Sequence, residues 1–152
     1  IVQLANKFKD HKFAFPVHLN PNVQTTVYQR LDGLQNVFLF KPVDYRTMVH
    51  LMANCELILT DSGGIQEEAP TLGKPVLVMR DTSERPEAIQ AGTAKLVGTD
   101  VEGVVNTVTE ILSNKASYSR MATAQNPYGN GNSVEKIISA MRKYWQEIDG
   151  KK

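Results

Sequence analysis

The chain alternates between short apolar runs and segments whose apolar residues recur at helical spacing. The runs are rich in Val, Ile, Leu and Phe and lack a regular polar alternation, a pattern that is typical of strands buried on both faces. The pattern therefore predicts a series of short strands. We expect strands at residues 12–18, 37–40, 56–60, 75–79 and 94–97.

Helices are predicted between these strands from capping residues as well as from periodicity. Asn20 followed by Pro21 is a typical helix start, and Asp44 can cap a second helix. Gly73 is a typical helix end, and Asp100 precedes the clearest helical stripe in the chain. The expected helices cover residues 1–8, 20–31, 44–53, 65–72, 86–91, 101–112 and 134–148.

This order of elements predicts an α/β fold, namely a Rossmann-like domain built on a doubly wound parallel sheet. Residues 126–133 (NPYGNGNS) are rich in turn-forming residues, so we expect a loop that separates the last helix from the body. The chain begins at Ile1 inside a segment that already has the helical pattern and no cap. We therefore expect a piece of a larger protein.

Composition excludes several classes of function. The 152 residues are 41% hydrophobic and carry a formal charge of +1, which gives no general reason to expect nucleic acid or an anionic membrane as partner. No apolar stretch approaches the roughly 18 residues of a membrane span, and no signal peptide is visible. Cys55 is the single cysteine, in an apolar context typical of an inert thiol. A cytoplasmic location is the default expectation.

The chemistry of the sequence concentrates at residues 61–64 (DSGG), where a predicted strand passes into a helix. Ligands of open α/β sheets bind beyond the carboxyl ends of the strands. A helix start offers unpaired N–H groups, and glycines let a phosphate approach them closely. A tight turn with Ser62 as a simple N-cap explains the spacing equally well. The pattern is neither a Walker loop nor GxGxxG, so a dinucleotide is not favoured.

Carboxylates and arginines follow on the same rim. Glu67 and Glu68 either compensate the helix dipole, or Glu68 holds a sugar diol, because a carboxylate accepts two hydroxyl hydrogens. Arg80 and Arg85, in residues 80–87 (RDTSERPE), either neutralise a pyrophosphate or pair with the acidic residues of their own loop. No pair of histidines has metal-ligand spacing, so no metal site is predicted.

Three stretches carry a resemblance to a known family. Residues 59–100 (LTDSGGIQEEAPTLGKPVLVMRDTSERPEAIQAGTAKLVGTD), 16–23 (PVHLNPNV) and 126–131 (NPYGNG) closely resemble the non-hydrolysing UDP-N-acetylglucosamine 2-epimerases. The resemblance covers essentially the whole chain. It implies the GT-B fold, in which two Rossmann-like domains enclose the active site. Residues 1–152 look like the C-terminal, UDP-binding domain of such an enzyme, without its N-terminal domain.

The resemblance implies an isomerase that interconverts UDP-GlcNAc and UDP-ManNAc, inverting C2 through elimination of UDP to a glycal and its re-addition. No metal or nicotinamide is consumed. Full-length relatives tend to be homodimers. The family's catalytic residues belong to the first domain, so we expect none in this chain and no activity from it alone. A glycosyltransferase donor domain of the same fold, or a nucleotide-binding module without chemistry, are the alternatives; the match at RDTSERPEA favours the epimerase.

Site residues are carried over position by position from the resemblance. The diphosphate and ribose would be held after the third predicted strand, the uracil after the second, and a second, regulatory UDP-GlcNAc near the first. These expectations name Ser62, Gly63 and Gly64 for the phosphates, Glu68 for the ribose, Arg85 for the nucleotide, Val43 and Met48 for the uracil side, and His18 for the regulatory ligand.

Overall fold

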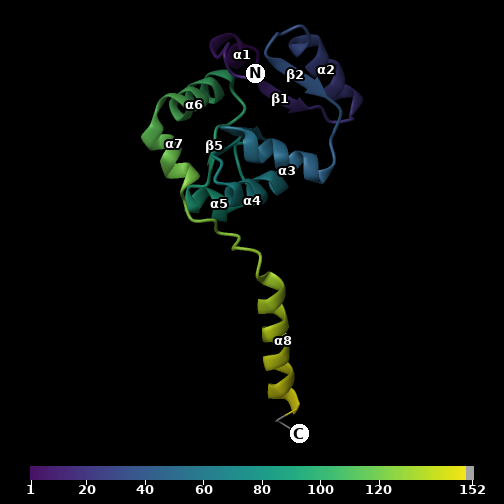
Figure 1. Cartoon of the computed structure of the whole chain (residues 1–152), viewed down its shortest axis with the longest axis vertical. Helices are drawn as coiled ribbons and strands as arrows, with labels where there is room; N and C mark the ends of the chain where they lie inside the picture. The colour runs from purple at the N-terminus through teal and green to yellow at the C-terminus, as the bar shows by residue number, and fades with distance from the viewer. Residues whose placement is uncertain (150–152) are drawn as a thin grey trace.

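Parallel strands and the helices that connect them form the body of the molecule, and one long helix projects from it (Figure 1). The computed structural model describes residues 1–149. Each strand lies within or close to a predicted apolar run. The strands are β1 (Phe13–Pro16), β2 (Val37–Phe40), β3 (Ile58–Thr60), β4 (Val76–Val78) and β5 (Ala94–Leu96).

The helices begin where capping residues predicted. Asn20 and Asp44 accept hydrogen bonds from first-turn amides, and Asp100 accepts one from Gly103 N–H at 2.7 Å. Each cap satisfies one of the amides that a helix start leaves unpaired. The helices are α1 (Val2–Lys7), α2 (Pro21–Leu31), α3 (Tyr45–Asn54), α4 (Gly63–Glu68), the 3₁₀ helix η1 (Ala69–Leu72), α5 (Pro86–Ala91), α6 (Val101–Ser113), α7 (Lys115–Ala122) and α8 (Ser133–Asp149).

Two helices differ from the sequence-based prediction. The helix expected at residues 65–72 begins at Gly63 and changes from α to 3₁₀ geometry at Ala69, because Pro70 has no N–H for the α-helical ladder. Helix α7 was not predicted. Asn114 caps it with hydrogen bonds from the Ala116 and Ser117 amides, but the helix buries one residue, Met121, so its apolar periodicity is weak.

The predicted parallel α/β architecture is confirmed, although the strands form two sheets instead of one continuous sheet. β1 pairs with β2, and the second sheet has the order β3–β4–β5. In the second sheet Thr60 lies beside Val78, and Val78 beside Leu96. The carboxyl ends of its three strands are therefore level, and the loops that follow them leave from one edge.

Strand β4 is the centre of the core and shows why the sheet is covered on both faces. Leu77 faces one hydrophobic cluster, together with residues from α1, α6 and α7. Val76 and Val78 face a second cluster, together with residues from α3 and α5. All three side chains are fully buried. Because successive strand residues point to opposite faces, helices on both sides of β4 exclude water from it.

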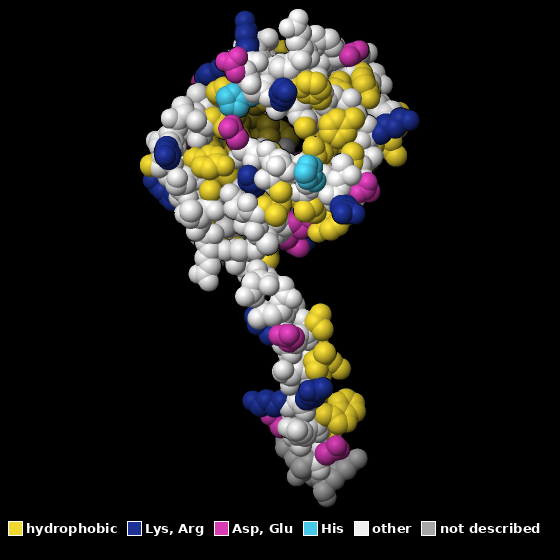
Figure 2. Space-filling model, in the orientation of Figure 1, with side chains coloured by type: hydrophobic (Ala, Val, Ile, Leu, Met, Phe, Trp, Pro, Cys, Tyr) yellow, Lys and Arg dark blue, Asp and Glu magenta, His cyan; other side chains and the backbone are white. Residues whose placement is uncertain are grey.

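The two-stranded sheet is covered less completely. Phe13 of β1 packs against the first cluster, whereas Phe38 of β2 is 50% exposed. Figure 2 shows a hollow in this part of the body, with hydrophobic side chains on its floor. The strands β1 and β2 are thus apolar, as the sequence predicted, but helices do not enclose them as they enclose β4.

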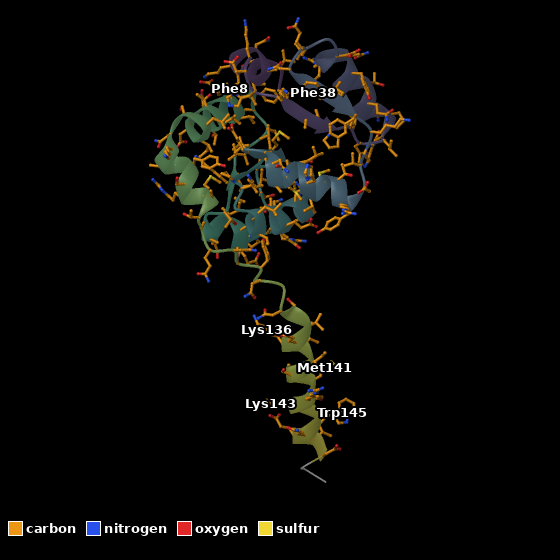
Figure 3. The ribbon with its side chains drawn as sticks, in the orientation of Figure 1. Phe8, Phe38, Lys136, Met141, Lys143 and Trp145 are labelled. Atoms are coloured by element: carbon orange, nitrogen blue, oxygen red, sulfur yellow. The ribbon has the colours of Figure 1, made fainter. Side chains whose placement is uncertain are left out.

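The turn-rich loop and α8 complete the chain. Asn126 Nδ2 donates a hydrogen bond to Thr71 Oγ1 at 2.8 Å, and Tyr128 packs in the second cluster, so the start of the NPYGNG loop is fixed to the body. Helix α8 buries none of its residues. In Figure 3, Met141 and Trp145 lie on one side of α8 and the labelled lysines on the other. Among the described residues, none of the helices combines the length and hydropathy that a membrane crossing requires.

Candidate functional site

The candidate site lies at the carboxyl edge of the three-stranded sheet. Strand β3 ends at Thr60 and leads through Asp61 and Ser62 into α4. Strand β4 ends at Val78 and leads into the loop of residues 79–85. The amide of Met79 donates a hydrogen bond to Thr60 O at 2.9 Å. This bond holds the loop after β3 and the loop after β4 side by side where they leave the sheet. This is the edge where ligands of parallel α/β sheets bind.

Ser62 occupies the N-cap position of α4 without acting as a cap. Its side chain makes no hydrogen bond to a first-turn amide, although its backbone has the extended conformation of an N-cap residue. Its own N–H donates to Thr60 Oγ1 at 3.1 Å, and the residue is exposed. The structure therefore disfavours the interpretation of Ser62 as a simple cap, and within residues 1–149 its hydroxyl makes no hydrogen bond.

Gly63 and Gly64 form the first turn of α4, and neither backbone conformation nor packing within residues 1–149 requires glycine at either position. Neither has a positive φ. A Cβ added at Gly63 would meet nothing within 4 Å, and one at Gly64 would meet only Ser62 Oγ, at 4.0 Å. The space in front of the first turn of α4 is therefore open at both glycines.

The adjacent carboxylates of α4 are in different surroundings. Glu67 Oε1 accepts a hydrogen bond from Arg85 Nε in an ion pair that is partly buried. This hydrogen bond and the charge of Glu67 raise the pKa of the Arg85 guanidinium above its usual value. Glu68 is half-buried, and within residues 1–149 it has no ion-pair or hydrogen-bond partner. Its two carboxylate oxygens are thus unpaired among the described residues.

The two arginines after β4, Arg80 and Arg85, form ion pairs of different kinds. Arg80 pairs with Glu84 of its own loop, with 3.3 Å between Nη1 and Oε1, which is the solvated pairing that the sequence allowed. Arg85 instead reaches across to Glu67 of α4, and its Nη1 donates to Glu84 O at 3.0 Å. The sequence-based alternatives for Arg85 did not include Glu67, because a pairing across 18 positions of the chain leaves no local signal.

Two further polar residues of the site were missed in the sequence. Gln66 is fully buried and bonded at both ends of its amide, to Ser62 and to Ser83. Buried polar side chains are costly unless they are hydrogen-bonded, so the bonds of Gln66 to Ser62 and Ser83 offset the cost of burying its amide. The sequence carries no signal for it, because the bond from Ser83 to Gln66 spans 17 positions of the chain.

The remaining predicted residues lie at the ends of other strands. Val43 and Met48 are half-buried near the start of α3, and Met48 belongs to the same hydrophobic cluster as Ile65 of α4. His18 is exposed after β1, and its Nδ1 accepts a hydrogen bond from Asn20 N–H at 3.1 Å. The cluster thus associates the start of α3 with α4, whereas His18 follows β1 of the two-stranded sheet.

Sequence comparisons place the chain among nucleotide-sugar enzymes. A family model described as UDP-N-acetylglucosamine 2-epimerase matches residues 1–142. The UDP-N-acetylglucosamine 2-epimerase of Yersinia pestis is 49% identical over 144 residues, which are 95% of this chain and 38% of that protein. The enzyme of the same name from Escherichia coli K12 is 51% identical over 142 residues, which are 93% of this chain and 38% of that protein.

Solved structures agree with this assignment. The crystal structure of UDP-GlcNAc 2-epimerase from Neisseria meningitidis bound to UDP-GlcNAc superposes with a TM-score of 0.89 and 46% identity, covering 93% of this chain and 38% of that one. The S. aureus MnaA–UDP structure gives 0.90 and 36%, covering 95% and 40%. The chain therefore spans about two fifths of the length of these relatives. From the family match and these identities, the chain belongs to the UDP-N-acetylglucosamine 2-epimerase family.

Proposed function

We propose that this chain is the C-terminal, UDP-binding domain of an epimerase that interconverts UDP-GlcNAc and UDP-ManNAc. The observation that carries the proposal is the Gly63–Gly64 turn at the carboxyl edge of the sheet, open in front of both glycines and unexplained by the chain's own packing. Family membership supports it, as do the similar structures that contain UDP-GlcNAc or UDP.

The diphosphate lies against the first turn of α4 in this proposal. Amides at the start of a helix have no partner within the helix and attract anions. The missing Cβ atoms of Gly63 and Gly64 let phosphate oxygens come within hydrogen-bond distance of those amides, and the Ser62 hydroxyl adds a donor. Arg85 supplies positive charge to the same edge, held in place by Glu67.

The nucleoside extends from the phosphates toward α3. Glu68 accepts both ribose hydroxyl hydrogens, which suits a carboxylate that has no partner among the described residues. The uracil side of the site is formed by Val43 and Met48, because Met48 shares a hydrophobic cluster with α4. His18 contacts a second, regulatory UDP-GlcNAc at the end of β1.

The reaction requires that UDP stays bound between its elimination and its re-addition. Elimination releases UDP from the sugar, and epimerisation is complete only when the same UDP adds back. A domain that grips the diphosphate and ribose keeps the leaving group beside the glycal and avoids a bimolecular recapture. The groups that move the C2 proton lie in the rest of the protein, so this chain alone is inactive. The full-length enzyme is a cytoplasmic homodimer and has no nucleic-acid partner.

Calorimetric titration of the chain with UDP tests the proposal. Wild type should bind UDP. Glu68→Ala should weaken binding by roughly tenfold or more, since hydrogen bonds to a charged group are worth about 1.5–3 kcal/mol each. Ser62→Ala should weaken binding less, because it removes one neutral donor. The matched control is Glu135→Ala, an exposed first-turn glutamate of α8, the helix that projects from the body. A chain that ignores UDP, or a Glu68→Ala variant that binds it as wild type does, would refute the assignment.

A further inference from the structure

A chain of hydrogen bonds links the two loops of the candidate site through a buried side chain. Gln66 Nε2 donates to Ser62 O at 3.2 Å. Ser83 Oγ donates to Gln66 Oε1 at 2.7 Å. The amide of Arg85 donates to Ser83 Oγ at 2.9 Å. The path therefore runs from the loop after β3, through α4, to the loop after β4.

The burial of Gln66 makes this series of hydrogen bonds rigid. The side chain is 0% exposed, so water cannot replace either of its bonds. An unpaired amide in such a place is strongly unfavourable, which fixes the positions of both partners relative to α4. Ser83 is half-buried and uses its hydroxyl as donor to Gln66 and as acceptor for Arg85. Both residues thus direct their polar side chains to partners within the protein.

Arg85 is held from its backbone as well as from its side chain. Ser83 fixes the Arg85 amide, and Glu67 fixes the Nε edge of the guanidinium. Both anchors originate in consecutive residues of α4, because Gln66 supports Ser83 and Glu67 binds Arg85 directly. Within residues 1–149, no hydrogen bond of Arg85 Nη2 is found. The anchored arginine thus keeps one donor group unpaired.

We propose that Gln66 and Ser83 are positioning residues that hold the DSGG loop and Arg85 in one register, so that both meet the same diphosphate. The inference rests on the proposed UDP site and adds residues that do not touch the ligand. The inference predicts different effects on the two parts of UDP. Loss of the link should weaken recognition of the phosphates and leave recognition of the nucleoside nearly unchanged.

Ser83→Ala tests the link, because it removes a hydroxyl without adding bulk. We expect UDP to bind about tenfold more weakly by calorimetry, while uridine binding, followed by NMR, stays within about twofold. Ser83→Thr keeps an oxygen at the same position and should restore UDP binding. Gln66→Glu, which loses the donor to Ser62 O and keeps the acceptor for Ser83, should weaken UDP in the same selective way. The NMR shifts that UDP induces at the Gly63 and Gly64 amides should shrink in the weakened variants.

Ser113→Ala is the matched control, because Ser113 Oγ donates to Thr109 O at 2.6 Å within α6 and the variant loses a comparable bond. It should bind UDP as wild type does. Equal losses for UDP and uridine, a loss that Ser83→Thr does not restore, or wild-type UDP affinity in Ser83→Ala would overturn the inference. Wild type that does not bind UDP at all would instead overturn the proposed function, so the two failures are distinct.

Discussion

Replacement of Gly64 by alanine should have opposite effects on the stability of the fold and on the proposed binding of UDP. The new methyl group would lie about 4.0 Å from Ser62 Oγ, an ordinary contact, and the backbone has no positive φ to relax. The substitution restricts the unfolded chain and improves helix propensity, so the free energy of unfolding should stay constant or rise by about 0.5–1 kcal/mol. For a chain of this length the melting temperature would stay constant or rise by up to roughly 4 °C.

Nucleotide binding should change in the opposite direction. The methyl group would occupy the open space in front of α4 where the phosphates are proposed to lie. A phosphate that is pushed away loses at least one hydrogen bond to a charged group, worth about 1.5–3 kcal/mol. The dissociation constant for UDP should therefore increase by roughly tenfold to a hundredfold. Thermal melting and calorimetric titration on the same preparation measure both effects.

Gly33→Ala is a matched control, for which we expect lower stability and unchanged UDP binding. A Cβ at Gly33 also meets nothing within 4 Å, but the residue has φ +83°, in the left-handed region that disfavours alanine. It lies between α2 and β2, before a strand and away from the carboxyl edge. This variant should lose roughly 1 kcal/mol of stability and bind UDP normally. A Gly64→Ala chain that binds UDP as tightly as wild type would refute the argument from open space.

Three further changes test the fold. Leu77→Ala should lower the free energy of unfolding by about 2–5 kcal/mol in urea denaturation, because the fully buried side chain fills one face of β4. Removal of residues 133–152 should leave the melting temperature within about 2 °C, since α8 buries nothing; a larger fall would show that α8 supports the body. The Thr47 amide and hydroxyl lower the pKa of Asp44 below 3.8, so its contribution is present above that pH and is lost as pH falls through the lower, folded pKa. The melting temperatures of wild type and Asp44→Asn should differ at pH 7 and converge below pH 3.8; a difference that persists in acid would contradict this.

Elements with strong local signals were predictable from the sequence. The caps at Asn20, Asp44 and Asp100 form as expected, and Gly73 ends η1 in the left-handed conformation. These features depend on residues within one helical turn of each other. Helix α7 was missed because it lies on the body mainly through Met121 and so lacks a strong apolar period. The division into two sheets was also missed, since strand pairing is a long-range choice.

The residues of the candidate site were named from the sequence, but their connections were not. Ser62, Gly63, Gly64 and Glu68 came from the strand–helix junction and from the family resemblance, and their roles toward a ligand stay predictions; in the structure Ser62 precedes α4 and the other three lie in it. The bond from Ser83 to Gln66 spans 17 positions, and the pair of Arg85 with Glu67 spans 18. No periodicity or short motif reports such a contact, because it exists only after β3 and β4 have paired.

By itself, the sequence determined the five strands, all the α-helices except α7, the starts of the helices capped by Asn20, Asp44 and Asp100, and the presence of two glycines where a strand meets a helix. These outcomes depend on local propensity and on the interval between apolar residues. Only the tertiary structure decided which strands pair, which helices cover β4, and that Arg85 is anchored to α4. The physical reason is that burial and charge pairing are properties of neighbours in space, and the parallel register of β3 and β4 chooses those neighbours.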